Sequence, residues 1–208
     1  MTSFHFGAVI LAAGASTRMG EPKQLLRLDG RTLLRRTVDT VFASSAWPVV
    51  VVLGARIDAI RPEVARLPVL VVENGEWKEG LASSIRAGVG VLETFSFLLE
   101  AALLVACDQP NLSAEAVARL ISVYRQGGPS IVTARYEGHS GPPALFGRSH
   151  FHELMGLRGS EGARPLFARH ADQLATVDLP ELATDLDTPE DLHKFLATSP
   201  ALKKPSGD

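Results

Sequence analysis

Apolar runs alternate with amphipathic segments along most of this chain. The runs are short, nearly continuous and rich in β-branched residues, which is typical of strands buried on both faces of a parallel sheet. They lie at residues 6–11, 48–54, 68–72, 102–107 and 130–135, with weaker runs at 143–146 and 174–179. We therefore expect a largely parallel sheet at the centre of the fold.

The segments between these runs have helical periodicity. They lie at residues 31–44, 56–67, 81–94 and 113–126, and two more helices are expected near 148–157 and 189–197. The alternating order of strands and helices predicts a doubly wound α/β sheet with right-handed crossovers. Ligands of such sheets bind at the carboxyl ends of the strands, so candidate site residues are sought there.

Composition narrows the classes of protein that fit. The chain has 208 residues, of which 46% are hydrophobic, and its net charge is −2. This length suits one domain, which we place at residues 1–198, followed by a flexible C-terminal tail at 199–208. The weak net charge gives no indication of a nucleic-acid or membrane-surface partner.

Targeting signals and cysteine chemistry are not expected. The first ten residues lack the charged and apolar regions of a signal peptide, and the apolar segment 95–107 is too short to span a membrane. Cys107 is the sole cysteine, so neither an intramolecular disulfide nor a cysteine metal cluster can form. We expect a cytoplasmic protein in which Cys107 is a packed strand thiol rather than a nucleophile.

The segment LAAGASTRMGEPKQLL, residues 11–26, directly follows the first predicted strand. Gly14 and Gly20 allow a tight backbone whose amides can converge on an anion. Arg18 can form bidentate hydrogen bonds with phosphate oxygens, and Lys23 supplies a mobile point charge. The segment is neither a Walker loop nor a G-x-G-x-x-G motif. The alternative is a solvated turn whose charges serve solubility.

Two acidic segments fall at the same predicted edge of the sheet. Asp108 follows a buried strand in CDQP, residues 107–110, and Asp187 lies in DLDTPEDL, residues 185–192. Strand alternation places Asp185 and Asp187 on one face. Two carboxylates together with phosphate oxygens and water suit Mg²⁺. The alternative is that these acids only cap or begin the helices that follow them.

Together these segments resemble the MobA-like nucleotidyltransferase family, and within it most closely the molybdenum cofactor cytidylyltransferases. Residues 11–26 match the pattern L-A-A-G-x-S-x-R-M-G-x-P-K-x-L-L at every defined position. Further matches lie at residues 74–88, 107–110, 141–146, 159–164 and 185–192. The resemblance implies one Rossmann-like, three-layer α/β domain with a mostly parallel, mixed sheet, as in nucleotide-diphospho-sugar transferases. It also implies nucleotidyl transfer to a phosphorylated pterin.

The resemblance assigns roles by position. The catalytic residues would be Arg18, Lys23 and Asp108, and Asp108 with Asp187 would bind Mg²⁺. The nucleotide would contact Ala12, Ala13, Gly14, Arg18, Lys23, Ser83 and Ser84, and the acceptor would contact Pro143, Gly162 and Arg164. The alternatives are that Ser83 and Ser84 are ordinary helix-start hydroxyls and that Gly162 and Arg164 merely begin a helix.

Two local departures bear on substrate choice. Guanylyl-transferring relatives typically have L-A-G-G where this chain has L-A-A-G, and the methyl group of Ala13 would favour a pyrimidine, hence CTP. Relatives often have G-H-P where residues 139–143 read HSGPP. This loop is two residues longer and could reshape the acceptor site.

We therefore expect transfer of CMP from CTP to the terminal phosphate of molybdopterin, with a molybdoenzyme or maturation factor as a candidate partner. The alternatives are a guanylyltransferase, a cytidylyltransferase with another acceptor, or a non-catalytic nucleotide- or cofactor-binding maturation factor. His150, His152 and His170 show no metal-ligand spacing with a carboxylate. We interpret them as surface or packing residues.

Overall fold

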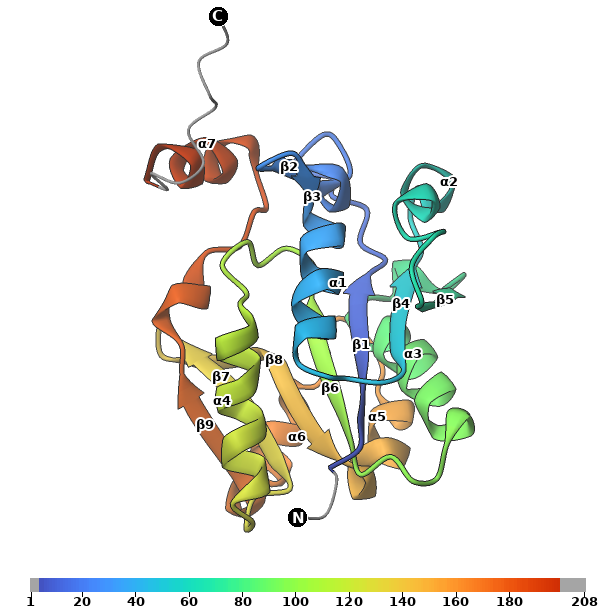
Figure 1. Cartoon of the computed structure of the whole chain (residues 1–208), viewed down its shortest axis with the longest axis vertical. Helices are drawn as coiled ribbons and strands as arrows, with labels where there is room; N and C mark the ends of the chain where they lie inside the picture. Colours follow the sequence, from blue (N-terminus) through green and yellow to red (C-terminus); the bar gives the residue numbers. More distant parts are fainter. Residues whose placement is uncertain (1–3, 199–208) are drawn as a thin grey trace, which may run out of the picture.

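A computed structural model describes residues 4–198, which fold around one seven-stranded sheet (Figure 1). Its strand order is β5-β4-β1-β6-β8-β7-β9. The bounds are β1 Phe6–Ala12, β4 Val49–Leu53, β5 Leu70–Glu73, β6 Ala101–Ala106, β7 Ile131–Tyr136, β8 His139–Gly147 and β9 Leu174–Asp178. All neighbours pair in parallel except β8, which is antiparallel to β6 and to β7. The prediction of a mostly parallel, mixed sheet is confirmed, whereas the predicted tail at 199–208 lies outside the described residues.

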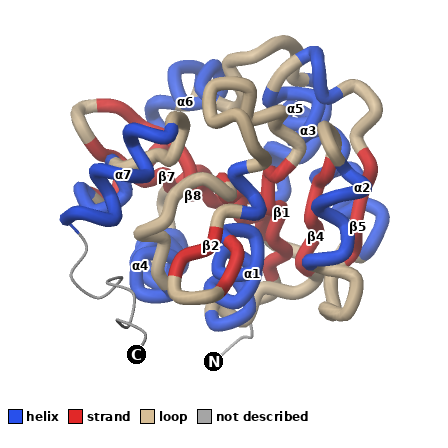
Figure 2. The backbone as a smooth tube through the Cα atoms, turned by 90° about the horizontal axis from the view of Figure 1, so that it is seen from above, coloured by secondary structure: helices blue, strands red, loops and turns tan. Residues whose placement is uncertain are grey.

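Helices cover both faces of the sheet and make three layers (Figure 2). One face packs against α1 (Leu33–Ala43) and α4 (Ala114–Arg125), and the other against α3 (Leu81–Phe95), α5 (Phe151–Gly156) and α6 (Arg164–Arg169). Consecutive residues of β1 and β4 enter opposite layers because strand side chains alternate. Both layers bury them fully, which explains why these strands read as continuous apolar runs.

Helix α3 lies unusually close to the sheet at Gly88. A Cβ atom there would be 2.2 Å from Cγ1 of Val9 in β1 and 3.1 Å from Cγ2 of Val52 in β4. The missing side chain therefore lets the helix pack directly on two central strands. This contact fixes the start of α3, Leu81, at the carboxyl edge of the parallel strands.

The predicted helix over residues 56–67 is wrong in extent. The structure has only the short helix α2 (Ile57–Ile60), followed by a 3-10 turn at Arg61–Glu63. Pro62 has no backbone N–H and cannot continue an α-helix from this position. The sequence prediction also missed the small hairpin of β2 (Arg27–Leu28) and β3 (Arg31–Thr32).

The segment 139–143, predicted as a lengthened loop, belongs to strand β8. Thr133 of β7 pairs with Ala144, but the next residue, Ala134, pairs with Gly141. Pro142 and Pro143 are thus two extra residues in β8 and form a bulge, which suits proline because it donates no ladder hydrogen bond. The extra length is observed, but inside a strand.

The final helix, α7 (Pro189–Thr198), begins with a reciprocal cap. The amide of Asp191 donates to Oγ1 of Thr188, and the amide of Thr188 donates to Oδ2 of Asp191. Asp191 therefore belongs to the start of a helix, which is the alternative that the sequence analysis gave for the acids of this segment. Within residues 4–198 no helix combines the length and the apolar character that a membrane crossing requires.

Candidate active site

The loop after β1 is shaped from its inside by Gln24. This side chain is buried, and its Nε2 donates to the carbonyl oxygens of Ala12 at 2.8 Å and Gly14 at 3.0 Å. The amide of Lys23 donates to Oγ of Ser16 at 3.1 Å. These bonds hold the loop over the carboxyl edge of the sheet and orient Lys23 toward the end of β6.

Charged side chains from three distant segments meet at this edge. Nζ of Lys23 donates to Oδ2 of Asp108 at 2.5 Å and to Oδ1 of Asp187 at 2.9 Å. Nη2 of Arg18 donates to Oδ2 of Asp187 at 2.7 Å. The expected proximity of the two cations and the two acids is thus observed, while their catalytic roles stay predictions.

The surroundings set the protonation of this group. Burial opposes the charge on Lys23, but its contacts with Asp108 and Asp187 outweigh burial and raise its pKa. Burial likewise disfavours the charged form of Asp187, but Lys23 and Arg18 lower its pKa. Burial together with repulsion from Asp108 and Asp187 raises the pKa of Asp185 to about 7. The site therefore holds a set of opposite charges that are already in contact with one another.

Alternation along residues 185–187 brings two of these acids to the same side. Leu186 is fully buried, and its amide donates to the carbonyl oxygen of Asp108 at 3.1 Å. Asp185 lines the cavity beside Asp108, and Asp187 contacts Lys23. The shared face expected from the sequence is present, although the segment lies outside any strand.

A cavity of about 480 Å³ opens beside the charged group. Six of the predicted site residues line it: Ala13, Gly14, Lys23, Ser84, Asp108 and Arg164. A smaller cavity of about 230 Å³ shares Leu11, Leu81, Pro142 and Arg164 with it and extends toward Phe167. Arg164 therefore lies where the two cavities join, a position suited to an anionic group held between them.

Besides Arg18, four predicted contact residues do not line either cavity. Ala12 is buried, and its carbonyl oxygen accepts from Gln24. Oγ of Ser83 donates to the carbonyl oxygen of Gly80, as expected for a helix-start hydroxyl. Pro142 rather than Pro143 faces the cavities, because the two occupy successive positions of the β8 bulge.

The fourth of these residues, Gly162, serves packing. Its φ is +62°, and a Cβ atom there would lie 2.7 Å from Cδ2 of Leu81. It begins the turn that leads into α6, so the alternative that Gly162 and Arg164 begin a helix is correct for the backbone. The side chain of Arg164 nevertheless lines both cavities.

Sequence reasoning missed three polar residues of the cavity wall or its support, namely Gln24, Gln109 and Tyr136. Nε2 of Gln109 donates to Oη of Tyr136 at 3.1 Å and to the carbonyl oxygen of Pro142 at 3.0 Å. Its buried Oε1 has no hydrogen-bond partner among the described residues. The available signal was an amide side chain inside each of two otherwise apolar or charged motifs, PKQLL and CDQP.

Cys107 is buried beneath the site. Burial, with a contribution from the neighbouring Asp108, raises the pKa of its thiol to about 12. A thiol in this state is a poor nucleophile, and Cys107 is packed as predicted, although it lies in the turn directly after β6 and not in the strand.

Two of the three histidines contact a carboxylate that the sequence did not bring near them. Nδ1 of His150 lies 3.4 Å from Oε1 of Glu153, and Nε2 of His170 lies 2.8 Å from the same oxygen. His150 is buried and His152 is exposed, as surface or packing residues would be. His150 and Glu153 are three residues apart at the start of a helix, whereas His170 approaches only through the fold.

Comparison with known proteins agrees with this geometry. The profile of the MobA-like NTP transferase domain matches residues 8–174. Nicotine blue oxidoreductase of Paenarthrobacter nicotinovorans is 34% identical over 200 residues, covering 90% of this chain and 95% of that protein. Molybdenum cofactor cytidylyltransferase of Escherichia coli (strain K12) is 22% identical over 184 residues, covering 88% and 91%.

Solved structures show the same fold. The homologue of Mycobacterium tuberculosis Rv0371c from Mycobacterium sp. strain JC1 is 30% identical, with a TM-score of 0.78, and the match covers 92% of this chain and 95% of that one. The manganese complex of Rv0371c itself is 28% identical, with a TM-score of 0.74 and coverage of 94% and 100%. The chain described here therefore belongs to the MobA-like NTP transferase family.

Proposed function

We propose that this nucleotidyltransferase transfers CMP from CTP to the terminal phosphate of molybdopterin and releases pyrophosphate. The observation that carries the proposal is the position of Lys23, whose ammonium group is shared by Asp108 and Asp187 beside the larger cavity. Arg18 completes the group through Asp187. A site for nucleotidyl transfer from a triphosphate needs both cations for the phosphates and carboxylates for a metal ion.

In the proposed reaction, an oxygen of the acceptor phosphate attacks the α-phosphorus of CTP. The new P–O bond forms as the bond to the β-phosphate oxygen breaks, and pyrophosphate leaves with that electron pair. The acceptor phosphate is already ionised near neutral pH, so no strong general base is needed. The main tasks of the protein are to position the two substrates and to offset charge.

The cations are placed for that second task. The side chain of Arg18 is 69% exposed, so it can turn from Asp187 toward bound phosphates at little cost. Lys23 is more enclosed, with 17% of its side chain exposed, and it remains at the entrance to the cavity. We assign bidentate phosphate binding to Arg18 and the stabilisation of the departing pyrophosphate to Lys23.

The carboxylates fit a divalent metal ion. Asp108 and Asp187 approach one ammonium group at 2.5 and 2.9 Å, so both can share a single cation. We propose that they hold Mg²⁺ when the nucleotide is bound, with phosphate oxygens and water as the remaining ligands. Mg²⁺ would supply charge neutralisation for the triphosphate. The manganese complex of the related Rv0371c supports a divalent cation in this family.

Ala13 supports the choice of CTP. Ala13 lines the larger cavity, where its methyl group takes up space that a glycine at this position would leave open. A smaller pyrimidine base suits the narrowed space. The similarity to the molybdenum cofactor cytidylyltransferase of E. coli supports both the base and the acceptor.

A second candidate is a redox activity. It is favoured by the 34% identity to a relative named nicotine blue oxidoreductase, which extends over 200 residues. Reduction of a dye, however, has no need for two cations and two carboxylates in mutual contact at the cavity entrance. The charged group therefore favours nucleotidyl transfer.

One assay separates these functions. Purified protein is mixed with Mg²⁺ and each NTP in turn, with and without molybdopterin, and pyrophosphate release is measured. A parallel set measures NADH or NADPH oxidation with nicotine blue as acceptor. We expect pyrophosphate only with CTP and molybdopterin together. Release with GTP instead would correct the base, and dye reduction without any pyrophosphate release would replace the proposal.

A further inference from the structure

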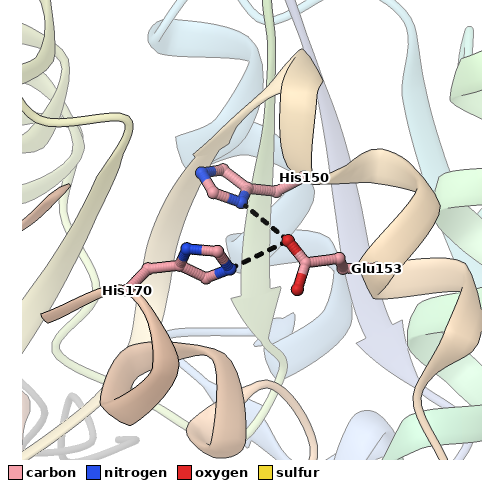
Figure 3. Close-up of side chains that lie close together, drawn as sticks. All are labelled: His150, Glu153 and His170. Carbon is pink, nitrogen blue, oxygen red and sulfur yellow. Dashed lines mark hydrogen bonds and ion pairs between the residues drawn. The ribbon is translucent and has the colours of Figure 1, made fainter.

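A second polar cluster lies at the opposite edge of the sheet. It contains His150, at the end of the 3-10 turn Arg148–His150, Glu153 in α5, and His170, directly after α6. Both imidazole rings are directed toward the Glu153 carboxylate (Figure 3). One ring nitrogen from each histidine and one carboxylate oxygen all lie within 4.8 Å of one another.

This cluster is separate from the nucleotide site. Gly147, which precedes the 3-10 turn, pairs with Ala101 at the start of β6, whereas Asp108 follows the end of β6. The six-residue length of β6 corresponds to a separation of about 20 Å between the two edges. None of the three residues lines either cavity of the active site.

The outer nitrogen of His150 is held in a defined state. Oγ of Ser130 donates its one hydrogen to Oε1 of Gln173 at 2.7 Å, so it can only accept from Nε2–H of His150, also at 2.7 Å. With Nε2 used as a donor, Nδ1 is the ring nitrogen that faces a carboxylate oxygen of Glu153, 3.4 Å away.

Glu153 is oriented in a similar way from outside the cluster. Its Oε2 accepts from Nη1 of Arg169 at 2.8 Å, which leaves Oε1 directed toward the two imidazoles. Nδ1 of His150 and Nε2 of His170 therefore both face the same oxygen, Oε1 of Glu153.

We propose that Nδ1 of His150, Oε1 of Glu153 and Nε2 of His170 bind a divalent transition metal ion, with Zn²⁺ as the preferred ion. These three atoms lie within 4.8 Å of one another, and two imidazoles with one carboxylate are a ligand set that suits zinc. Tetrahedral zinc with bonds of about 2.1 Å separates its ligands by about 3.4 Å. The distance of 3.4 Å from Nδ1 of His150 to Oε1 of Glu153 already matches, and Nε2 of His170 lies 2.8 Å from the same oxygen.

The outer contacts complete the site. Metal-bound histidines usually donate their other ring N–H to a fixed acceptor, as His150 does to Ser130, and such contacts raise affinity. The side chains of His170 and Glu153 are 19% and 28% exposed, so a solvent molecule can occupy a fourth position. The ion would join α5 to the segment after α6 and, through Ser130 and Gln173, to the starts of β7 and β9.

The competing interpretation is a cluster held by hydrogen bonds alone, with a proton in place of the ion. Zn²⁺ titration by calorimetry separates the two, carried out with excess Mg²⁺ as a competitor for Asp108 and Asp187. The test variants are His170→Gln and Glu153→Gln. The matched control is His152→Gln, which replaces an exposed histidine on α5, the helix that also contains Glu153.

We expect one Zn²⁺ per chain in the wild type and in His152→Gln. Each test variant should lower the affinity by about 10²-fold or more, because loss of a ligand exceeds the usual cost of losing an outer contact. Co²⁺ in place of Zn²⁺ should give the strong visible absorption bands of a four-coordinate ion in the same two proteins only. Wild-type affinity no higher than that of His170→Gln would overturn the proposal.

A measurement on the wild type covers the case in which a variant fails to fold. Diethyl pyrocarbonate modifies accessible histidines, and mass spectrometry locates each product. Zn²⁺ should protect His170 from modification and leave His152 fully reactive. Equal modification of His170 with and without Zn²⁺ would refute the site. Zinc binding that persists in Glu153→Gln but is lost in Asp108→Asn would place the ion at the nucleotide edge instead.

Discussion

The two edges of the sheet hold polar clusters that differ in how their charges are balanced. At the carboxyl edge, Lys23 contacts Asp108 and Asp187, and Arg18 contacts Asp187, so cations and acids satisfy one another. At the opposite edge, here called the amino edge, Arg169 pairs with one carboxylate oxygen of Glu153, and the other oxygen faces His150 and His170. In the first cluster cations and acids hold one another, whereas the second gathers three potential metal ligands around one position.

This difference teaches how each site would respond to its ligand. A nucleotide with Mg²⁺ must exchange partners at the carboxyl edge, since phosphates take the cations and the metal ion takes the acids. A metal ion at the amino edge only fills a position, and little needs to move. We therefore expect the carboxyl edge to govern turnover and the amino edge to govern local stability.

The sharpest test of this comparison is one substitution at each edge. Asp108→Asn should lower turnover by about 10²-fold or more, because it removes a charge that the transition state requires. His170→Gln should leave turnover with CTP within about twofold, since it lies a β-strand's length, about 20 Å, from the reacting phosphates. Steady-state pyrophosphate release measures both. A comparable loss in both variants would mean that the edges are not independent.

The sequence predicted the carboxyl edge well for a physical reason. Its charged residues lie in loops directly after strands, and parallel strands deliver such loops to one edge whatever the helix packing. Thus Lys23 and Asp108 could be brought together from strand order alone. The assignment of Pro143 by resemblance was wrong, because strand alternation breaks down at the β8 bulge and turns Pro142 toward the cavity.

The amino edge could not be foreseen in the same way. His150 and Glu153 carried a weak signal in their three-residue spacing, but His170 reaches them only through α6, a six-residue helix too short to give a clear periodicity. The fold was predictable where the runs of apolar residues were long. It was not predictable around Pro62, where the apolar periodicity was typical of a helix but proline, which has no backbone N–H, interrupted it.

Replacing Lys23 tests whether its ammonium group holds the metal position at the carboxyl edge when no nucleotide is bound. Lys23→Met should raise the KM for CTP by roughly 10- to 100-fold, the value of a hydrogen bond to a charged group. The same variant should bind Mn²⁺ more tightly without nucleotide, because Asp108 and Asp187 lose an internal competitor.

The matched control is Lys78→Met. This substitution removes another cation from the wall of the same cavity. The Nζ atom of Lys78 lies 5.5 Å from the centroid of the Trp77 ring. The substitution should change both measurements much less. Unchanged Mn²⁺ affinity in Lys23→Met would mean that the ammonium group does not occupy the metal position.

Helix α3 connects the two edges, and its two inner glycines test how rigid that connection is. Gly88→Ala places a methyl group 2.2 Å from Cγ1 of Val9 and should destabilise the fold by about 1–3 kcal/mol through overpacking. Gly90→Ala meets nothing nearer than Sδ of Met155 at 3.9 Å, and it should stabilise the fold by about 0.5–1 kcal/mol. Urea unfolding measures both, and changes of the same sign would contradict the close helix–sheet contact at Gly88.

The smallest expected effect concerns the clamp that joins the start of α3 to the loop after α5. The guanidinium of Arg86 donates to both carboxylate oxygens of Glu79 and to the carbonyl oxygen of Leu157, and the amide of Gly159 donates to Glu79. The hydrogen bonds from Arg86, and then that from Gly159, lower the pKa of Glu79 from 4.5 to about 2. The ionised carboxylate is therefore favoured in the folded state.

The sign of the pH dependence follows from this lowered pKa. The unfolded chain takes up a proton at Glu79 near pH 4.5, whereas the folded chain does so only near pH 2. The stabilisation is thus fully present above pH 4.5 and is lost as the pH falls through about 2. Glu79→Gln should lower the melting temperature near neutral pH, and the difference from wild type should shrink steadily below pH 4.5. Glu76→Gln, whose side chain is 74% exposed, is the matched control and should show little of this trend. A difference between Glu79→Gln and wild type that stays constant down to pH 3 would mean that the clamp acts through shape and not through charge.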